Sequence, residues 1–386
     1  MTTSLSKRSK FIEKAEIRTM TVECEKVGGI NLAQGVCDTG TPQIILDNVN
    51  YAMKQGINTY TRHDGLQIIR EAIAKKLLRD NSISVDPETE IVVSAGSTGA
   101  FYCACFALLD PGDEVLLFEP YYGYHLNTLE ACEAIPAFVT LRPPDWSFSV
   151  KELEKAITSR TKGIMICTPS NPCGKIFSRE ELLKIAELAI KHDFFIFTDE
   201  IYEYILYDGA KHISPGSIKE IADRVVTIGG YSKTYSITGW RIGFAACRAK
   251  WAEMIGYLND LVYVCAPAPL QYGVAKGIDE LPKSFYDNLA LEYKKKRDMI
   301  CNSLRKAGMP PWVPAGSYYV LVDASKLPGK TSKAKAMFLL EKTGVAAVPG
   351  DAFYHGTEGD NILRFCYAKT TEVLEKASKK LEELDF

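Results

Sequence analysis

One lysine stands out because the residues around it could set up covalent chemistry. Lys233 follows an apolar run at 225–228 and two glycines, and Arg241 comes eight residues later. If that run is a parallel strand, Lys233 projects from its carboxyl end into the crevice where open α/β sheets bind ligands. A lysine in this place can form an imine with a carbonyl compound. The alternative is an ordinary solvated lysine.

Polar residues also follow three other apolar runs of the chain. Ser97 and Thr98 stand at the start of an expected helix, where free N–H groups favour an anion. Asn171 lies in a proline-rich turn at 168–174, and Asp199 ends the run at 194–198. A carboxylate at such a strand end is expensive to bury without a cationic partner. The alternatives are a plain helix start, a structural turn and a helix N-cap.

These strand ends together offer an amine, a carboxylate, a cation, hydroxyl groups and a cradle for an anion. Pyridoxal phosphate has an aldehyde, a ring nitrogen, a phenolic oxygen and a phosphate, so this set of groups suits it. An acid that partners the ring nitrogen is the expected device for making the cofactor an electron sink. The sequence therefore predicts pyridoxal 5′-phosphate as cofactor.

The combination resembles the fold-type-I pyridoxal-phosphate enzymes of the class I/II aminotransferase family. The resemblance is carried by Ser-Asn-Pro-Cys-Gly at 170–174, Asp-Glu-Ile-Tyr at 199–202, Ser-Lys-Thr at 232–234 with Gly-Trp-Arg at 239–241, and Leu-Arg-Phe at 363–365. It extends from about residue 30 to the C-terminus.

The resemblance implies a role for each matching residue around the cofactor ring. Lys233 is similar to the family's Schiff-base lysine, which also moves the proton. Asp199 would pair with the ring nitrogen, and Tyr202 and Asn171 would hydrogen-bond the phenolic oxygen. Tyr122 occupies the position that stacks on the ring.

For the phosphate, the resemblance implies Ser97, Thr98 and Arg241, with Ser232 as a further candidate. Tyr60 matches a tyrosine that reaches the phosphate of a neighbouring subunit, so a homodimer is expected. Gly230 departs from the family, because many relatives carry a phosphate-binding serine three residues before the lysine.

For the substrate, the resemblance implies that Arg364 grips the α-carboxylate as a bidentate fork. The N–H of Gly35 and the amide of Asn171 would assist it, and Tyr318 lies in a segment that borders the pocket. His125 is a candidate for bordering the pocket as well, although a satisfied or surface histidine is the plainer interpretation.

The implied activity is transfer of an α-amino group to a 2-oxo acid, in ping-pong fashion through pyridoxal and pyridoxamine phosphate. Aromatic residues near the pocket segments favour an aromatic, kynurenine, glutamine or methionine-like donor, with aspartate or alanine still open. A pyridoxal-phosphate-dependent lyase or amino-acid oxidase is the alternative, and a non-catalytic ligand-sensing domain is a remote one.

Composition narrows the function classes. A net charge of −2 argues against a nucleic-acid partner. The chain has neither an apolar run long enough to span a membrane nor a signal-peptide core at its start. Its 11 cysteines form no C-x-x-C pair, which favours reduced thiols in a cytoplasmic protein without a metal site.

The pattern of elements predicts an α/β fold. From residue 90, apolar runs at 90–94, 114–118, 163–167, 194–198 and 225–228 alternate with helical stretches. This rhythm indicates a large domain with a mainly parallel sheet flanked by helices, and the family resemblance implies that the sheet has seven strands. Capping boxes are expected at Ser149 and Ser178, and an amphipathic helix covers 66–77 with Arg70 and Lys76 between its apolar positions.

Beyond about residue 280 the rhythm changes to that of a smaller α+β domain. A long helix to residue 306, with a solvated basic face at 294–297, precedes strands at 318–322, 345–348 and 363–367, and a last helix follows. A helix at 11–26 is expected near the start. We predict an N-terminal arm with part of the small domain at 1–45, the large cofactor-binding domain at 46–280 and the small C-terminal domain at 281–386.

Overall fold

The computed structural model describes residues 4–6, 9 and 15–385. Its largest sheet has seven strands in the order β2-β8-β7-β6-β5-β3-β4. Only β8 runs antiparallel to its neighbours, and all other adjacent pairs in this sheet are parallel. The predicted α/β class with a mainly parallel seven-stranded sheet is therefore confirmed. The strands are β2 (Ile91–Ala95), β3 (Glu114–Glu119), β4 (Ile135–Thr140), β5 (Thr161–Cys167), β6 (Phe195–Asp199), β7 (Val225–Gly230) and β8 (Ile242–Ala246).

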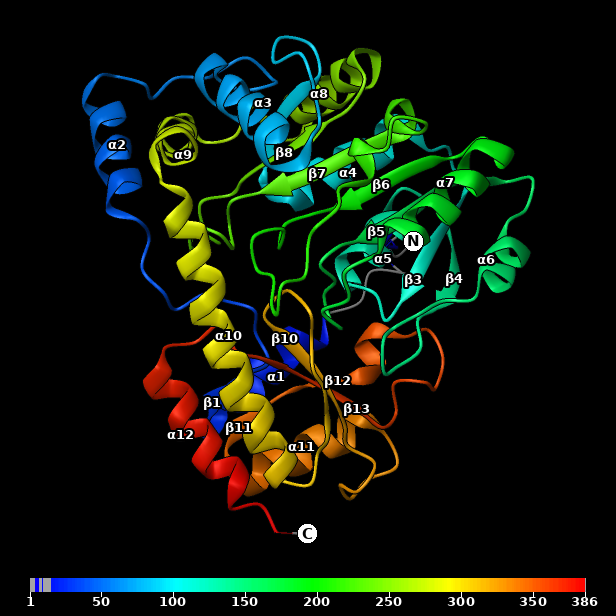
Figure 1. Ribbon diagram of the computed structural model, residues 1–386, viewed down its shortest axis with the longest axis vertical. Coiled ribbons are helices and arrows are strands. Elements are labelled where there is room, and N and C mark those ends of the chain that lie inside the picture. The colour runs from blue at the N-terminus through cyan, green and yellow to red at the C-terminus, as the bar shows by residue number, and fades with distance from the viewer. Residues whose placement is uncertain (1–3, 7–8, 10–14, 386) are drawn as a thin grey trace.

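Helices cover both faces of this sheet. Successive side chains of each strand point to opposite faces, so apolar side chains have to be covered on both. Leu117 of β3 packs with α4, α5 and α8, whereas its neighbour Leu116 packs with α6 and α7 on the opposite face. Over β2 and β8 that second face is covered by α3 and α9, with α2 against α9 (Figure 1). The helices are α2 (Gln43–Lys54), α3 (Gln67–Asn81), α4 (Gly96–Leu108), α5 (Gly123–Ala131), α6 (Val150–Ala156), α7 (Arg179–His192), α8 (Ala249–Tyr263) and α9 (Ala268–Glu280).

Two strands of the large sheet, β4 and β8, were not expected from the sequence. β4 contains Pro136, which an edge strand tolerates because one of its sides has no ladder partner. β8 is rich in small residues, and at Gly243 the packing requires one. A Cβ there would lie 2.4 Å from the carbonyl carbon of Gly96 and from the nitrogen of Ser97. The small residue lets β8 pass directly under the start of α4.

The two expected capping boxes differ. Ser178 and Glu181 form a complete box at the start of α7. Ser149 accepts the N–H of Glu152 at 3.3 Å, but the Glu152 carboxylate pairs with Arg142 instead of returning to the backbone. The second box is therefore half formed.

The lower part of Figure 1 contains the smaller sheets. β12 (Val348–Pro349), β13 (Ile362–Cys366), β10 (Tyr319–Asp323) and β9 (Pro311–Trp312) form an antiparallel sheet, and β1 (Ile30–Asn31) pairs in parallel with β11 (Val345–Ala346). The strand expected at 345–348 is thus two strands in two sheets. Around them lie α1 (Glu16–Lys26), α10 (Lys283–Lys306), α11 (Ser332–Thr343) and α12 (Thr371–Glu382).

Of the helix expected at 11–26, residues 11–14 lie outside the described residues, and the helix begins at Glu16. The pairing of β1 with β11 brings the N-terminal part of the chain beside its C-terminal part. This pairing supports our proposal of a small domain built from 1–45 and 281–386, with the large domain between them. Within the described part of the chain, no helix has both the length and the apolar character needed to cross a membrane.

The expected solvated face at 294–297 is wrong for two of its four residues. Lys296 and Arg297 are each 3% exposed. Arg297 donates from Nη1 to Asp208 at 2.6 Å and to the carbonyl of Pro314 at 3.1 Å. The basic run therefore fixes α10 against the loop after β6 rather than facing water.

Candidate active site

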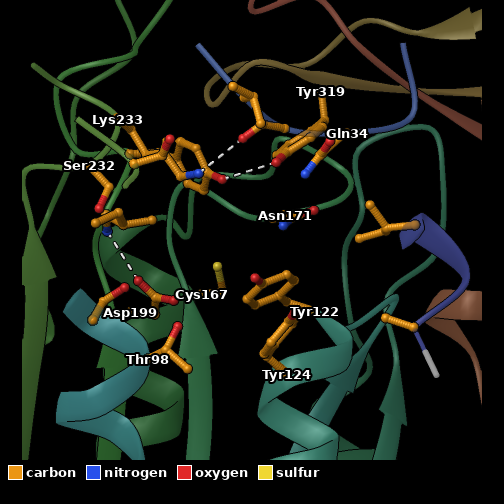
Figure 2. A pocket seen from close by; sticks show the side chains of 18 of the residues that line it. Gln34, Thr98, Tyr122, Tyr124, Cys167, Asn171, Asp199, Ser232, Lys233 and Tyr319 are labelled. Atoms are coloured by element: carbon orange, nitrogen blue, oxygen red, sulfur yellow. Dashed lines mark hydrogen bonds between the residues drawn. The ribbon is translucent and has the colours of Figure 1, made fainter. Parts of the chain in front are cut away.

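A cavity of about 460 Å³ opens where the carboxyl ends of the central strands meet. Asn171 follows β5, Asp199 ends β6 and Lys233 follows β7, so three neighbouring strands each deliver a polar side chain to it. Figure 2 shows these side chains and Tyr122 around one space. The predicted convergence of strand ends is thus what the structure displays.

Lys233 enters the cavity with few partners. Its Nζ donates to the carbonyl of Gly35 at 3.2 Å and lies 5.6 Å from the ring centre of Tyr318. No carboxylate of the described residues forms an ion pair with it. Burial lowers the pKa of the Lys233 ammonium, and the charge of Arg241 adds to that effect. The neutral amine, which is the nucleophilic and basic form, is therefore more accessible than in a solvated lysine.

Asp199 is held by a histidine. His125 Nε2 lies 3.0 Å from Asp199 Oδ2, and the N–H of Ile201 donates to Oδ1 at 3.2 Å. Both side chains are buried. The His125 ring also meets Tyr122 edge-on, with ring centres 5.2 Å apart. The sequence left open whether His125 belongs to the pocket. The only local signal for such a role is its position about one helical turn after Tyr122.

At one end of the cavity Arg241 approaches the start of α4. Its Nη2 donates to the carbonyl of Ala95 at 3.3 Å and its Nη1 to the carbonyl of Thr238 at 2.9 Å. Gly96 has φ +74°, and a Cβ there would lie 2.2 Å from Arg241 Nη2, so only glycine leaves room. Arg241 itself has φ +58°, a strained backbone for a non-glycine residue.

The first N–H groups of α4 belong to the turn that carries Ser97 and Thr98, and such groups have no partner inside a helix. Both residues line the cavity. Ser232 is buried, with its Oγ 3.5 Å from Arg241 Nη1. A helix N-terminus, a guanidinium and hydroxyl groups at one place are suited to a phosphate.

Tyrosines form much of the remaining wall. Tyr202 donates to the hydroxyl of Tyr319 at 3.3 Å, and burial raises the pKa of Tyr202 well above its ordinary value. Tyr122 stacks with Tyr124, with ring centres 5.2 Å apart and planes 25° apart. The cavity is therefore both aromatic and, at its strand-end side, polar.

Arg364 lies behind this wall. Its Nη1 donates to Asn171 Oδ1 at 2.9 Å and its Nη2 to the carbonyl of Ala33 at 2.7 Å. The guanidinium lies 4.2 Å from the ring centre of Tyr319, and its buried Nε has no hydrogen-bond partner. Among the described residues no carboxylate pairs with it. A buried arginine without a counter-ion is a place where an anion is stabilised.

Tyr318 lies elsewhere than expected, and Tyr60, which is expected at the site of a neighbouring subunit, lies outside the cavity of its own chain. Tyr318 is fully buried behind Lys233, where it donates to the carbonyl of Gly35 at 3.2 Å, and Tyr319 is the residue that lines the cavity. Tyr60 is 82% exposed and outside the cavity of its own chain. Gly230, where relatives carry serine, is tightly packed, since a Cβ would lie 2.8 Å from Ile201 Cδ1.

Residues 27–381 match the family model described as aminotransferase class I and II. The aspartate aminotransferase of Pyrococcus abyssi is 33% identical over 99% of this chain and 98% of its own length. Kynurenine–oxoglutarate transaminase 3 of Rattus norvegicus is 32% identical over 91% of this chain and 84% of its own length. The solved N-succinyldiaminopimelate aminotransferase of Mycobacterium tuberculosis superposes with a TM-score of 0.94, at 30% identity, covering 98% of this chain and 99% of that structure. The chain therefore belongs to the class I and II aminotransferase family, whose members depend on pyridoxal phosphate, and it transfers amino groups between amino acids and 2-oxo acids.

Proposed function

We propose that this aminotransferase binds pyridoxal phosphate through Lys233 and uses an aromatic or kynurenine-type amino acid as its donor. The observation that carries the proposal is the state of Lys233. Its amine has a lowered pKa, lacks a carboxylate partner among the described residues and shares a cavity with Asp199 and Arg241.

The residues present fit the cofactor. Because Gly96 has no Cβ, the Arg241 guanidinium can lie beside the start of α4. The guanidinium and the first N–H groups of α4 together form a cradle for a phosphate. When bound, pyridoxal phosphate stabilises the negative charge that develops at the α-carbon of the substrate. The residues proposed to hold it are Ser97, Thr98, Ser232 and Arg241 for the phosphate, Asp199 for the ring nitrogen, Tyr202 and Asn171 for the phenolic oxygen, and Tyr122 for the ring face.

The protein's own groups would then divide the work. Lys233 Nζ removes the proton from the α-carbon of the donor, and in the second half of the ping-pong cycle it returns one to the 2-oxo acid. Arg364 holds the α-carboxylate together with Asn171 and the N–H of Gly35. His125 keeps the Asp199 carboxylate oriented through its 3.0 Å contact.

The donor is proposed from the cavity wall. Tyr122, Tyr124, Tyr319 and Ile17 line it, and such a wall suits a large aromatic side chain. The name of the rat relative points the same way, whereas the Pyrococcus relative keeps aspartate as the second candidate. Glutamine, methionine-like and alanine donors belong in the same assay. The matched proteins give no support to a lyase, an oxidase or a ligand-sensing domain.

We also propose a homodimer in the cytoplasm, with Tyr60 reaching the neighbouring site. The segment after Tyr60 contacts α8 and the residues that follow it, because the N–H of Thr61 lies 3.5 Å from Cys265 Sγ and the His63 ring 5.1 Å from that of Tyr257. On α8, Tyr257 and Leu261 are 52% and 80% exposed. Such an apolar patch is typical of a surface that a partner covers. The cysteines, all free, suit a reducing compartment.

The test combines an assay with a mass measurement. Purified protein is given aromatic amino acids, kynurenine, glutamine, methionine, aspartate and alanine against several 2-oxo acids, and the products are quantified. Borohydride reduction followed by peptide mass spectrometry should place the cofactor on Lys233. Release of ammonia or hydrogen peroxide in place of a transaminated product would overturn the proposed reaction, and a cofactor mass on another lysine would overturn the role of Lys233.

A further inference from the structure

Arg18 is a cavity residue that the roles above do not use. It lies in the first turn of α1 and lines the same cavity as Lys233, together with Ala15 and Ile17. Its side chain is exposed and makes no hydrogen bond or ion pair with any described residue. Figure 2 shows the start of this blue helix across the cavity from Lys233.

The cavity has an excess of positive charge. Apart from Lys233, whose lowered pKa favours the neutral amine, its charged lining residues are Arg18 and Arg241 against the single acid Asp199, which already contacts His125. The acid nearest to Arg18 along α1 is Glu16, and its carboxylate is paired with Lys333. Among the residues that the structure describes, no carboxylate therefore neutralises Arg18 at the wall opposite the reacting amine.

The other cations are already matched to anions. Arg241 with the start of α4 suits the cofactor phosphate, and the buried Arg364 suits the α-carboxylate common to every substrate. Arg18 has no such group left to bind. A guanidinium fork recognises a carboxylate bidentately, so a second carboxylate at the far end of the substrate would complete the set.

We propose that Arg18 is a specificity residue that binds the distal carboxylate of a dicarboxylic 2-oxo acid, the amino-group acceptor, and of the dicarboxylic amino acid formed from it. This inference deepens the proposed function and rests on it. It explains how a cavity with aromatic walls also accepts an acidic substrate. The aromatic side chain packs on the tyrosines, and the carboxylate meets Arg18 at the wall across from Lys233.

The test compares two unreactive ligands that differ by one carboxylate, glutarate and butyrate. Their affinities for the cofactor-loaded protein are measured by calorimetry, for the wild type, Arg18→Gln, Arg18→Lys and Lys26→Gln. Lys26 is the matched control, because it lies on the same helix, has a side chain 62% exposed and is outside the cavity. Its replacement removes the same charge.

The wild type should bind glutarate more tightly than butyrate, and Arg18→Gln should weaken glutarate about tenfold, which is what a charge-assisted hydrogen bond of about 1.4 kcal/mol is worth. The affinity of Arg18→Gln for butyrate should differ from that of the wild type by less than about twofold. Arg18→Lys should retain part of the preference, and added salt should erode it in the wild type more than in Arg18→Gln. Lys26→Gln should match the wild type.

Equal affinities of the wild type for glutarate and butyrate would overturn the inference, as would equal losses for both ligands in Arg18→Gln. Steady-state assays add a second reading. Arg18→Gln should raise the KM for 2-oxoglutarate about tenfold while kcat changes little. A wild type that binds glutarate through Arg18 but transfers no amino group would refute the proposed function and leave the carboxylate site standing.

Discussion

Two lysines of this chain, the buried Lys76 and the half-buried Lys233, are held in opposite ways. Lys76, on α3, is 1% exposed, forms an ion pair with Glu203 and donates to Asn81 Oδ1 at 2.8 Å. Lys233 has only the carbonyl of Gly35 at 3.2 Å, and no described carboxylate pairs with it. The two residues share a type and differ in their counter-ions.

The surroundings of Lys76 extend the contrast. Glu203 also accepts from Asn81 at 2.8 Å, and the neighbouring Glu200 contacts His212 Nε2 at 2.7 Å. Although Glu200, Glu203 and His212 stand close enough to share a metal ion, the Lys76 ammonium already pairs with Glu203. A buried charge with its partners is structural, whereas desolvation without a carboxylate partner lowers the pKa of Lys233 and makes its reactive neutral form more accessible.

The largest expected effect is on the reactive side of the comparison. Lys233→Ala should lower kcat by about four orders of magnitude or more, because both the covalent link and the proton transfer are lost. The free energy of unfolding of the cofactor-free protein should not fall, since the change removes a half-buried amine with a single hydrogen bond. Stopped-flow or steady-state assays and urea unfolding measure the two quantities. Lys233→Arg, which keeps the charge, should be as inactive, and near-normal turnover in either variant would contradict the assignment.

Lys76 should show the reverse pattern. Lys76→Met leaves the Glu203 carboxylate buried without its cation, so the free energy of unfolding should fall by about 3–5 kcal/mol. The adjacent Lys75, with a side chain 65% exposed, provides the control, and Lys75→Met should cost less than about 1 kcal/mol. Urea unfolding measures both. A loss for Lys76→Met no larger than that of the control would show that the pair does not anchor α3.

The sequence could predict the strand ends but not which lysine is buried with partners. Lys233, Asp199 and Asn171 follow apolar runs, and that local pattern alone places them at one edge of the sheet. Lys76 stands between apolar positions of α3 and looks like part of a polar face, yet it is buried. Its partner Glu203 comes from the segment after β6, and no periodicity in the sequence reports a contact between such distant residues.

Two details of the site were beyond sequence reasoning for related reasons. Tyr318 and Tyr319 are adjacent, and a shift of one residue in a strand exchanges the faces of its side chains. The register of β10 against β13, with Tyr319 opposite Cys366, decides that Tyr319 lines the cavity. The His125 contact with Asp199 likewise depends on how α5 packs against β6.

The lowered pKa of Lys233 predicts a pH dependence of stability. Between the lowered folded value and the ordinary 10.5, the unfolded chain holds a proton that the folded chain lacks. Stability relative to Lys233→Met should therefore rise with pH through this window, by at most about 1.4 kcal/mol per pH unit, and be lost as pH falls below it. Urea unfolding of the two cofactor-free proteins at several pH values measures the difference. A difference that falls as pH rises would show that Lys233 is held as an ammonium.

The smallest expected effect tests whether the Lys76 cluster acts as one network. Asn81 links Lys76 to Glu203 and lies outside the cavity. Asn81→Ala should lower the free energy of unfolding by about 1–3 kcal/mol, because buried hydrogen-bonding groups lose a partner. In the double variant with Asn81→Ala and Lys76→Met, the loss should be smaller than the sum of the two single losses by at least about 0.5 kcal/mol. This is the coupling expected for residues in contact. Strict additivity would mean that Lys76 is held by Glu203 alone, and the contrast with Lys233 would then rest on a single ion pair.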